Sequence, residues 1–565
     1  MPGRIVLSVV AAATILLAGA SNAAGQAFFP SGVTAPGRLV FDVPDGRGTS
    51  GAGFDAGVAQ SDGRIAVVAS TSLGALLLRL TPAGARDRSF GDAGAVVVPT
   101  VAGFGAGVVQ VLDRGGGRLL VVRIVPGASI SASPHLQFVA LTADGHPDPA
   151  FGVAGIAQAP VQHGCLNSCR PVAVTADGSI LVTGTNEAPL VVDGRVMNQA
   201  ARTWTVARLR PDGLLDAAFG DAGVVTIAVP SVDGYGSAVV SLSDGTIATA
   251  GWNGTHGTVT RLLSDGSPDP AFNDTQPVNI FGFAPTAILE RPDRALDLLV
   301  SDAFVARVPA DGQSVSTVTS TGSGVGALLP TPGGGELVVD VAGPPRLPRT
   351  RITLQPIDAA GAPGQPVTVT APFGGGRASP PGGTFAGPTD PAVAQSYFRA
   401  APPFATPDGR VVVAGSVVLA VPAVAEDSEQ REAAIAVLGP DGRLDPAFGG
   451  PAPAPRVRIT VPPRRVNVTA TKTAQVGVLL APSTAGLANV RIRARGKLVA
   501  RSTIAVSGEN RYGVNLTRAG LGVLRRHPRL RVRATIRFRD IFGAAAPVRR
   551  AGGVVRLGRV RCPRC

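Results

Sequence analysis

Short apolar runs separated by Asp-Gly pairs make up most of this chain. Such pairs precede mostly apolar runs at residues 62–63, 177–178, 244–245 and 408–409, and weaker versions stand at 114–117, 293–294 and 333–335. A two-residue hairpin turn needs a positive φ at both central positions, which Asp-Gly adopts readily. The pattern therefore predicts short antiparallel strands joined by tight turns.

A longer phrase, Asp-Gly-x-x-Asp-x-x-Phe, alternates with these pairs. Its copies occupy residues 144–151, 212–219, 265–272 and 441–448, a looser copy occupies 83–90, and degenerate copies begin at 311 and 360. Phe90, Phe151, Phe219 and Phe272 are 61, 68 and 53 residues apart, so the period is real but elastic. Each phrase therefore occurs seven times, and a repeat of this length is typical of solenoids and propellers.

Each unit contains four short strands, which in the third unit are expected at 155–159, 170–174, 180–183 and 203–209. Seven such units favour an all-β fold whose main part is a β-propeller of seven four-stranded blades. Six blades are the alternative, if the degenerate copies at 311 and 360 merge into one irregular unit. The repeated phenylalanine is expected to fill the seam between neighbouring blades.

These phrases carry a resemblance to a known repeat. The pattern Asp-Gly-x-x-Asp-x-x-Phe-Gly-x-x-Gly at residues 212–223, and more loosely at 144–155, resembles the bacterial delta-60 repeat. The resemblance extends over residues 27–450, although the fifth and sixth units lack the Phe and the second Asp. It implies an exported, propeller-like protein and supplies no catalytic residues.

The composition and the first residues of the chain indicate the cellular compartment in which the protein is expected. The 73 Gly and 49 Pro among 565 residues disfavour long helices, and 45% hydrophobic residues exclude a disordered chain. Arg4, an apolar run at 5–18 and a small-x-small pattern at 21–23 predict a signal peptide at residues 1–23. No later apolar run reaches the length of a membrane span. We therefore expect a bacterial protein that is secreted and is extracellular or associated with the cell wall.

Charge separates the end of the chain from the rest. After a Pro-rich linker at 451–463, we expect a small immunoglobulin-like β-sandwich at 464–560, with a short helical turn near 517–524. Residues 456–565 contain 25 Lys and Arg against two acidic residues, a net charge of +23, whereas the whole chain has +14. Arginine alternates here with apolar residues, which predicts strands with one apolar and one cationic face. The candidate contacts for an anionic polymer are Arg491, Arg493, Arg495, Arg529, Arg531, Arg533, Arg537 and Arg539.

This arginine pattern has two interpretations. Guanidinium groups bind phosphate and carboxylate through paired hydrogen bonds, which suggests an anionic cell-envelope polymer as partner. GC-rich coding also raises arginine content, since only two of the 52 basic residues are lysine, and the face would then be merely solvated. Nucleic acid is not expected, because the protein is exported and this region has few aromatic residues for base stacking.

Residues with catalytic or metal-binding chemistry are sparse. The cysteines Cys165, Cys169, Cys562 and Cys565 form two close pairs almost 400 residues apart, which favours local disulfides over a zinc site. The five histidines are dispersed, and the Asp-Gly-x-x-Asp turns lack the spacing of a calcium loop, so we expect no metal and no cofactor. The sequence favours a non-enzymatic binding or scaffold protein whose propeller contacts an unknown protein or glycan. The alternative is a propeller hydrolase or lyase acting on an extracellular polysaccharide.

Overall fold

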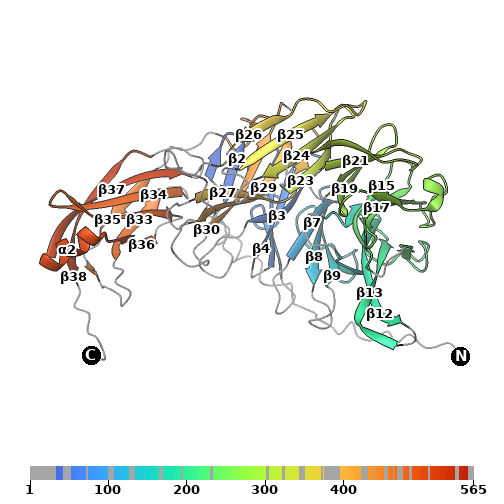
Figure 1. The fold of residues 1–565 in the computed structure, drawn as a ribbon, viewed down its shortest axis with the longest axis horizontal. Coiled ribbons are helices and arrows are strands. Elements are labelled where there is room, and N and C mark those ends of the chain that lie inside the picture. The colour runs from blue at the N-terminus through green and yellow to red at the C-terminus, as the bar shows by residue number, and fades with distance from the viewer. Residues whose placement is uncertain are drawn as a thin grey trace.

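The computed structural model is built almost wholly from β-strands. It describes residues 33–41, 53–71, 74–99, 107–125, 134–164, 169–192, 195–229, 233–300, 304–320, 325–342, 350–370, 373, 395–420, 430–439, 441–450, 456–461, 464–466, 475–482, 486–506, 510–527, 529–540 and 546–557. The expected signal peptide at 1–23 lies outside these residues, as do Cys165, Cys562 and Cys565. Figure 1 shows the order of the elements along the chain.

The first three blades are antiparallel and have four strands each. Blade 1 contains β3 (Phe54–Ala59), β4 (Ile65–Thr71), β5 (Gly74–Leu80) and β6 (Ala95–Pro99). Blade 2 contains β7 (Gly107–Asp113), β8 (Leu119–Val125), β9 (His135–Leu141) and β10 (Ile156–Gln162). Blade 3 contains β11 (Val172–Val174), β12 (Ile180–Val192), β13 (Arg195–Leu209) and β14 (Val224–Ile227). Blades 2 and 3 are joined into one sheet where Gln162 pairs with Thr185.

The next three blades repeat this arrangement. Blade 4 contains β15 (Tyr235–Ser241), β16 (Ile247–Trp252), β17 (Gly257–Leu262) and β18 (Val278–Ile280), with a 3-10 turn at Asn273–Thr275. Blade 5 contains β19 (Pro285–Glu290), β20 (Leu296–Val300), β21 (Phe304–Val308) and β22 (Ser316–Ser320). Blade 6 contains β23 (Val325–Pro330), β24 (Glu336–Ala342), β25 (Arg351–Ile357) and β26 (Val367–Thr370).

Blade 7 is assembled from both ends of the repeat region. It contains β27 (Gln395–Ala400), β28 (Phe404–Ala405), β29 (Val411–Ala420), β30 (Gln430–Leu438), β2 (Arg38–Phe41) and β1 (Val33–Ala35). Arg38 pairs with Ala436 and Phe41 pairs with Ala433. A strand from the beginning of the region therefore completes the sheet that ends it.

The first strands of the blades form a closed ring. β3 contacts β7, and the contacts continue through β11, β15, β19 and β23 to β28, which contacts β3 again. At this last contact Phe404 lies so close to Gly57 that a Cβ on the glycine would be 2.5 Å from the ring. In the part of the chain that the structure describes, the propeller thus has seven blades, as expected. The six-blade alternative is wrong, because the degenerate copies at 311 and 360 belong to separate blades.

The blade boundaries lie one strand later than expected. Residues 155–159, expected as the first strand of the third unit, lie mostly in β10, where Ile156 pairs with Val139 of β9. The other three segments of that unit belong to β11, β12 and β13 of blade 3. The reason is that, in blades 1 to 4, the Asp-Gly-x-x-Asp-x-x-Phe phrase joins the third and fourth strands of one blade. The strand that follows the phenylalanine completes its own blade.

The repeated phenylalanines fill the seams between blades. Five of them have side chains at most 1% exposed: Phe90, Phe151, Phe219, Phe272 and Phe448. The residue after each one donates its N–H to the next blade, as Gly91 does to the carbonyl of Asp144 and Gly220 to that of Asp265, both at 2.7 Å. Each of these blades is thereby attached to the next by one buried ring and one backbone hydrogen bond.

Residues 456–557 form two further sheets. One contains β31 (Val457–Thr460), β33 (Gln475–Pro482) and β36 (Asn510–Asn515), and the other contains β32 (Arg464–Val466), β38 (Arg549–Leu557), β37 (Arg529–Asp540), β34 (Gly486–Ala494) and β35 (Lys497–Val506). Side chains of both sheets, such as Val478 and Ile536, belong to one apolar core. β31 begins inside the segment expected to be a linker, because Val457 and Val461 are buried in this core.

The one α-helix among the described residues lies near the expected position. α2 (Arg518–Arg526) begins after Thr517, whose hydroxyl accepts the N–H of Gly520 and caps the helix. Within the described ranges, no helix has the length and apolar character required to cross a membrane.

Candidate functional site

The propeller has two unlike faces. Strand direction alternates within each blade, so the turns between first and second strands and between third and fourth strands lie on one side, which we name the turn face. The connections between second and third strands, and those between blades, lie on the opposite side, the loop face. These loop-face connections vary in length from residues 72–73 to residues 371–394. Loops of varied length on a constant scaffold commonly carry binding residues.

The second Asp of the repeated phrase stabilises the turn face. In blade 4 the side chain of Asp269 accepts the N–H of Ala271 and the Nε–H of Arg261, the latter at 2.5 Å. The Arg261 guanidinium also lies 4.9 Å from the ring centroid of Phe272. Blades 1 and 3 contain the same three-residue arrangement. Throughout the described ranges, no group of three His, Cys, Asp or Glu side chains is placed to hold a metal ion.

The seam between blades 5 and 6 contains buried charges in place of the phenylalanine. Arg291 Nη1 lies 2.9 Å from Glu336 Oε1, and Arg307 Nη2 lies 2.6 Å from Asp297 Oδ2. Both guanidiniums also donate to backbone carbonyls of the turn 359–361 in blade 6. Burial, together with a hydrogen bond to Asp297, raises the pKa of Glu336 to about 8. Both carboxyl groups are at most 2% exposed, so this pair joins two blades and does not face the solvent.

An arginine at the loop-face end of blade 3 reaches a blade that is not its neighbour in the ring. Arg170 precedes β11 of blade 3, and its Nη2 donates to the carbonyl of Pro403 in blade 7 at 3.0 Å. Blades 3 and 7 are not neighbours in the ring, so this hydrogen bond links two blades that share no seam. The preceding residue, Cys169, is disulfide-bonded, and its partner lies outside the described residues.

A carboxyl group lies at the same end of the ring. Asp55, near the start of β3, accepts the N–H of Ser70 at 2.6 Å. Burial raises the pKa of Asp55, although part of its side chain contacts solvent. Ser237 and Thr286 occupy the equivalent irregular positions of β15 and β19, and their hydroxyls donate to backbone carbonyls. Asp55 therefore has a structural role in its bulge.

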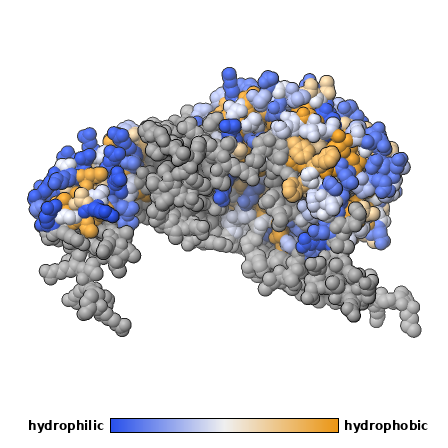
Figure 2. Space-filling model, viewed as in Figure 1, coloured by the Kyte–Doolittle hydropathy of each residue, from blue (hydrophilic) through white to orange (hydrophobic). Residues whose placement is uncertain are grey.

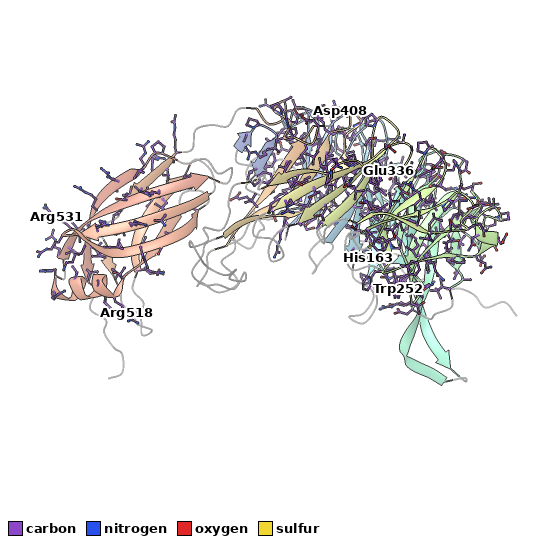
Figure 3. All side chains as sticks on the ribbon, turned by 45° about the horizontal axis from the view of Figure 1, so that its top comes forward. His163, Trp252, Glu336, Asp408, Arg518 and Arg531 are labelled. Atoms are coloured by element: carbon purple, nitrogen blue, oxygen red, sulfur yellow. The ribbon has the colours of Figure 1, made fainter. Side chains whose placement is uncertain are left out.

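A stacked aromatic pair, one ring half-buried and the other exposed, lies on the loop face of blade 4. Trp252, the last residue of β16, stacks on Phe283 with 6.2 Å between ring centroids and an interplanar angle of 24°. Phe283 and Phe281 are 69% and 80% exposed. Figure 3 shows Trp252 at the end of the propeller from which the β12–β13 hairpin projects. Trp204, in contrast, is fully buried.

Three of the described histidines lie in different parts of the chain. His146 pairs with Asp144 on the turn face at 3.1 Å, whereas His527 lies 3.3 Å from Arg495 in the C-terminal sheets. His163 lies at the loop face, where burial lowers its pKa. Figure 3 shows His163 near the base of the projecting hairpin.

The alternating arginines lie on the outer side of the five-stranded sheet, as the period of two predicts. Arg493 of β34 stands directly opposite Arg533 of β37, and Arg491 stands opposite Arg501 of β35. Apolar residues between them, such as Ile492, are buried. We name as the arginine face the exposed residues Arg491, Arg493, Arg501, Arg529, Arg531, Arg533, Arg537 and Arg550. Of the other candidates, Arg495 is exposed at the end of the sheet, and the side chain of Arg539 lies outside the described residues.

The arginine face has no ion-pair partner among the side chains that the structure describes. The two acidic residues of 456–565 are Glu509 and Asp540, and both of their side chains fall outside the description. Figure 3 shows side chains such as Arg531 extending outward, and Figure 2 shows hydrophilic residues along the edges of this part of the molecule. Like charges directly opposite each other on a sheet repel, so a bound polyanion would relieve an unfavourable interaction.

Three groups of side chains were missed by the sequence analysis. Arg170 and the cluster around Glu336 have partners in distant parts of the chain, whereas Asp55 has its partner Ser70 on the adjacent strand of its own hairpin. The position of Arg170 directly after a cysteine offered the one local signal.

Solved structures resemble this chain at low sequence identity. A streptogramin B lyase structure has 12% identity and a TM-score of 0.36, and the match covers 68% of this chain and 93% of that chain. Prolyl oligopeptidase B from Galerina marginata has 11% identity and a TM-score of 0.36, with 76% of this chain and 55% of that chain covered. The extracellular domain of a hybrid two-component system from B. thetaiotaomicron has 10% identity and a TM-score of 0.26, with 94% and 73% covered.

Comparison with family models identifies a propeller repeat in two segments of the chain. No curated protein matches the chain. Residues 60–90 and 242–272 match a family model described as "Domain of unknown function (DUF5122) beta-propeller". Each matched segment runs from an Asp-Gly turn through the second and third strands of its blade to the buried phenylalanine. With these two segments similar to that family and seven blades in a closed ring, the chain is a propeller-like repeat protein.

Proposed function

We propose that this is an exported, non-enzymatic binding protein. Its propeller presents an interaction surface, and its arginine face tethers it to an anionic polymer of the cell envelope. The arginine face carries this proposal, because its guanidiniums are exposed, in register and without a described carboxylate partner. A polyanion can accept paired hydrogen bonds from several of them at once.

The loop face is the proposed contact surface of the propeller. Its support is the pair of exposed phenylalanines Phe281 and Phe283, the second of which stacks on the half-buried Trp252, since exposed aromatic side chains commonly mark binding sites for proteins and glycans. The carboxyls of Asp297 and Glu336, of which Glu336 has a raised pKa, are buried in a blade seam, and this position favours a role in packing over a role in hydrolysis.

Export rests on the predicted signal peptide at residues 1–23. N-terminal sequencing of protein recovered from the culture medium or the cell wall tests it, with Ala24 as the expected first residue. Recovery of the chain only from the cytoplasm with Met1 intact would contradict export.

The tether is tested by co-sedimentation of the purified chain with envelope fragments over a range of salt concentrations. The variant R493A/R533A removes two opposed guanidiniums, and the control R518A/R526A removes two exposed ones from α2. We expect wild type and control to sediment at low salt and to be released as salt rises, and R493A/R533A to sediment less. Equal sedimentation of all three proteins at every salt concentration would contradict the tether.

A further inference from the structure

The spacing of the arginine face defines the kind of anion that it fits. We propose that its ligand is a linear phosphodiester polymer without bases, lying along β34 and β37. This inference rests on the proposed tether and names its chemical class.

The guanidiniums form a track that follows the strand direction. Arg529, Arg531 and Arg533 occupy three successive outward positions of β37, and alternate residues of a strand are about 6.7 Å apart. The neighbouring strand adds Arg493 and Arg491 about 4.8 Å to the side. The track is therefore two strands wide and several charges long. A polymer with a charge in every backbone linkage can meet successive guanidiniums along it.

Phosphodiester linkages fit this track better than carboxylates on sugar rings. The phosphate charge lies in the polymer backbone, and its oxygens match the guanidinium fork. A flexible spacer between phosphates can adjust to the separation of alternate strand residues. A uronate polymer, in contrast, carries its carboxylates on rigid rings, which cannot adjust to the separation of the guanidiniums in the same way.

The face offers no described aromatic platform for a sugar or a base. The outward positions between the arginines hold Thr535 and Asn489, which stand opposite Arg491 and Arg537. Phe538, on the same strand as the arginines, is 2% exposed and belongs to the core. Recognition on this face therefore uses charge and hydrogen bonds, and stacking of nucleotide bases has no described side chain to support it.

Opposed arginines also make the phosphate contact favourable. Arg493 and Arg533 are cross-strand partners, as are Arg491 and Arg501, so each pair places two like charges within direct reach of each other. A phosphate between two such side chains accepts hydrogen bonds from both and converts a repulsive pair into an attractive bridge.

The test uses the full chain and four probes: poly(glycerol phosphate) in short and long fractions, polygalacturonate and single-stranded DNA. Dissociation constants are measured over a salt series. We expect the long poly(glycerol phosphate) to bind most tightly, and log affinity to fall with log salt by about 0.7 for each phosphate contacted.

Matched variants identify the contacting side chains. R493A/R533A should weaken binding and reduce the salt slope by about 1.4, the value for two lost contacts. R493K/R533K keeps both charges but lacks the fork, so the salt slope should persist while affinity falls. The control R518A/R526A should match wild type, and near-wild-type melting temperatures would show that each variant is folded.

The contrary outcomes distinguish failure of the phosphodiester ligand from failure of the tether. Equal affinity for polygalacturonate, lost again in R493A/R533A, would overturn the phosphodiester ligand and leave the tether standing. Tighter binding of single-stranded DNA than of poly(glycerol phosphate) would also overturn it, because bases would then contribute. Failure of every probe to bind, with envelope sedimentation unaffected by R493A/R533A, would overturn both the ligand and the tether.

Discussion

Phe219 of blade 3 lies against Gly266 of blade 4, so closely that a Cβ on the glycine would be 3.0 Å from Cε2 of the ring. Gly266 also has a φ of 90° in its own turn. The glycine of the repeated Asp-Gly pair therefore meets two demands: a positive φ in its own turn and an absent side chain where the previous blade docks. The repeated Asp-Gly turn therefore forms a hairpin within its own blade and also contacts the preceding blade.

Alanine substitutions separate these two demands. Gly245 has a φ of 84°, and a Cβ at this position would have no other atom within 4 Å, whereas a Cβ on Gly266 would meet the neighbouring blade. We expect Gly245→Ala to lower the free energy of unfolding by about 1–2 kcal/mol through backbone strain. Gly266→Ala should cost about 1–3 kcal/mol more through overpacking. Urea unfolding measures the free energy of unfolding of both variants. An equal decrease in the two variants would show that the contact between Gly266 and the neighbouring blade does not contribute to stability.

The seam phenylalanine should be a major stabilising residue. Phe219 is fully buried between blades, so we expect Phe219→Ala to lower the free energy of unfolding by about 3–5 kcal/mol. Phe281, which is 80% exposed, is the matched control, and its change to Ala should stay within about 0.5 kcal/mol. Thermal and urea unfolding of the two variants provide the comparison. A small loss for Phe219→Ala would mean that the seams are held mainly by the backbone.

The buried Asp–Arg pair of blade 4 depends on both charges. Asp269 and Arg261 are at most 7% exposed, and Asp269→Asn leaves the guanidinium buried without its counter-charge. We expect a loss of about 3–5 kcal/mol in the free energy of unfolding. The control Asp441→Asn, at an exposed pair with 4.0 Å between charged atoms, should change it by less than about 1 kcal/mol. Similar losses at both positions, measured by urea unfolding, would contradict this assignment.

Glu336 should make stability depend on pH. Its pKa is about 8 in the folded protein against an ordinary value of 4.5, so the folded state keeps a proton that the unfolded state releases. The free energy of unfolding should therefore fall as pH rises from about 4.5 to about 8, and then level off. Glu336→Gln, which mimics the protonated form, should flatten this slope, whereas the control Glu290→Gln should leave it in place. An unchanged slope in Glu336→Gln would assign the pH dependence to other groups.

Local patterns predicted the features that depend on neighbouring residues. Asp-Gly pairs mark turns because of their backbone geometry, and the alternation at 529–537 places arginine outward because side chains alternate along a strand. The blade boundaries were misplaced because a turn phrase does not reveal whether the next strand stays in the same sheet. The Pro- and Gly-rich segment 371–405 includes β27 and β28, because its last residues pair with β29, a strand that lies beyond the segment itself.

Contacts between distant repeats leave no local pattern. Arg170 reaches Pro403 across the ring, and the Arg291–Glu336 pair joins two blades that lack the seam phenylalanine. These contacts result from the closed ring of blades, so the spacing of residues along the chain does not predict them. The outward arginines of the C-terminal sheets could be placed from the sequence, but their register across strands could not.

Because β2 pairs with β30, the ring closes only after almost 400 intervening residues have been made and folded. Blades 1 to 6 are built from strands that are neighbours in the chain, whereas β2 and β30 pair across the whole repeat region, and long-range pairing of this kind slows folding. An interrupted or clipped chain would leave the edges of β2 and β30 open to strands of other molecules. Ring closure thus covers two strand edges at once, because β2 and β30 each pair along the edge that would otherwise be open to another molecule.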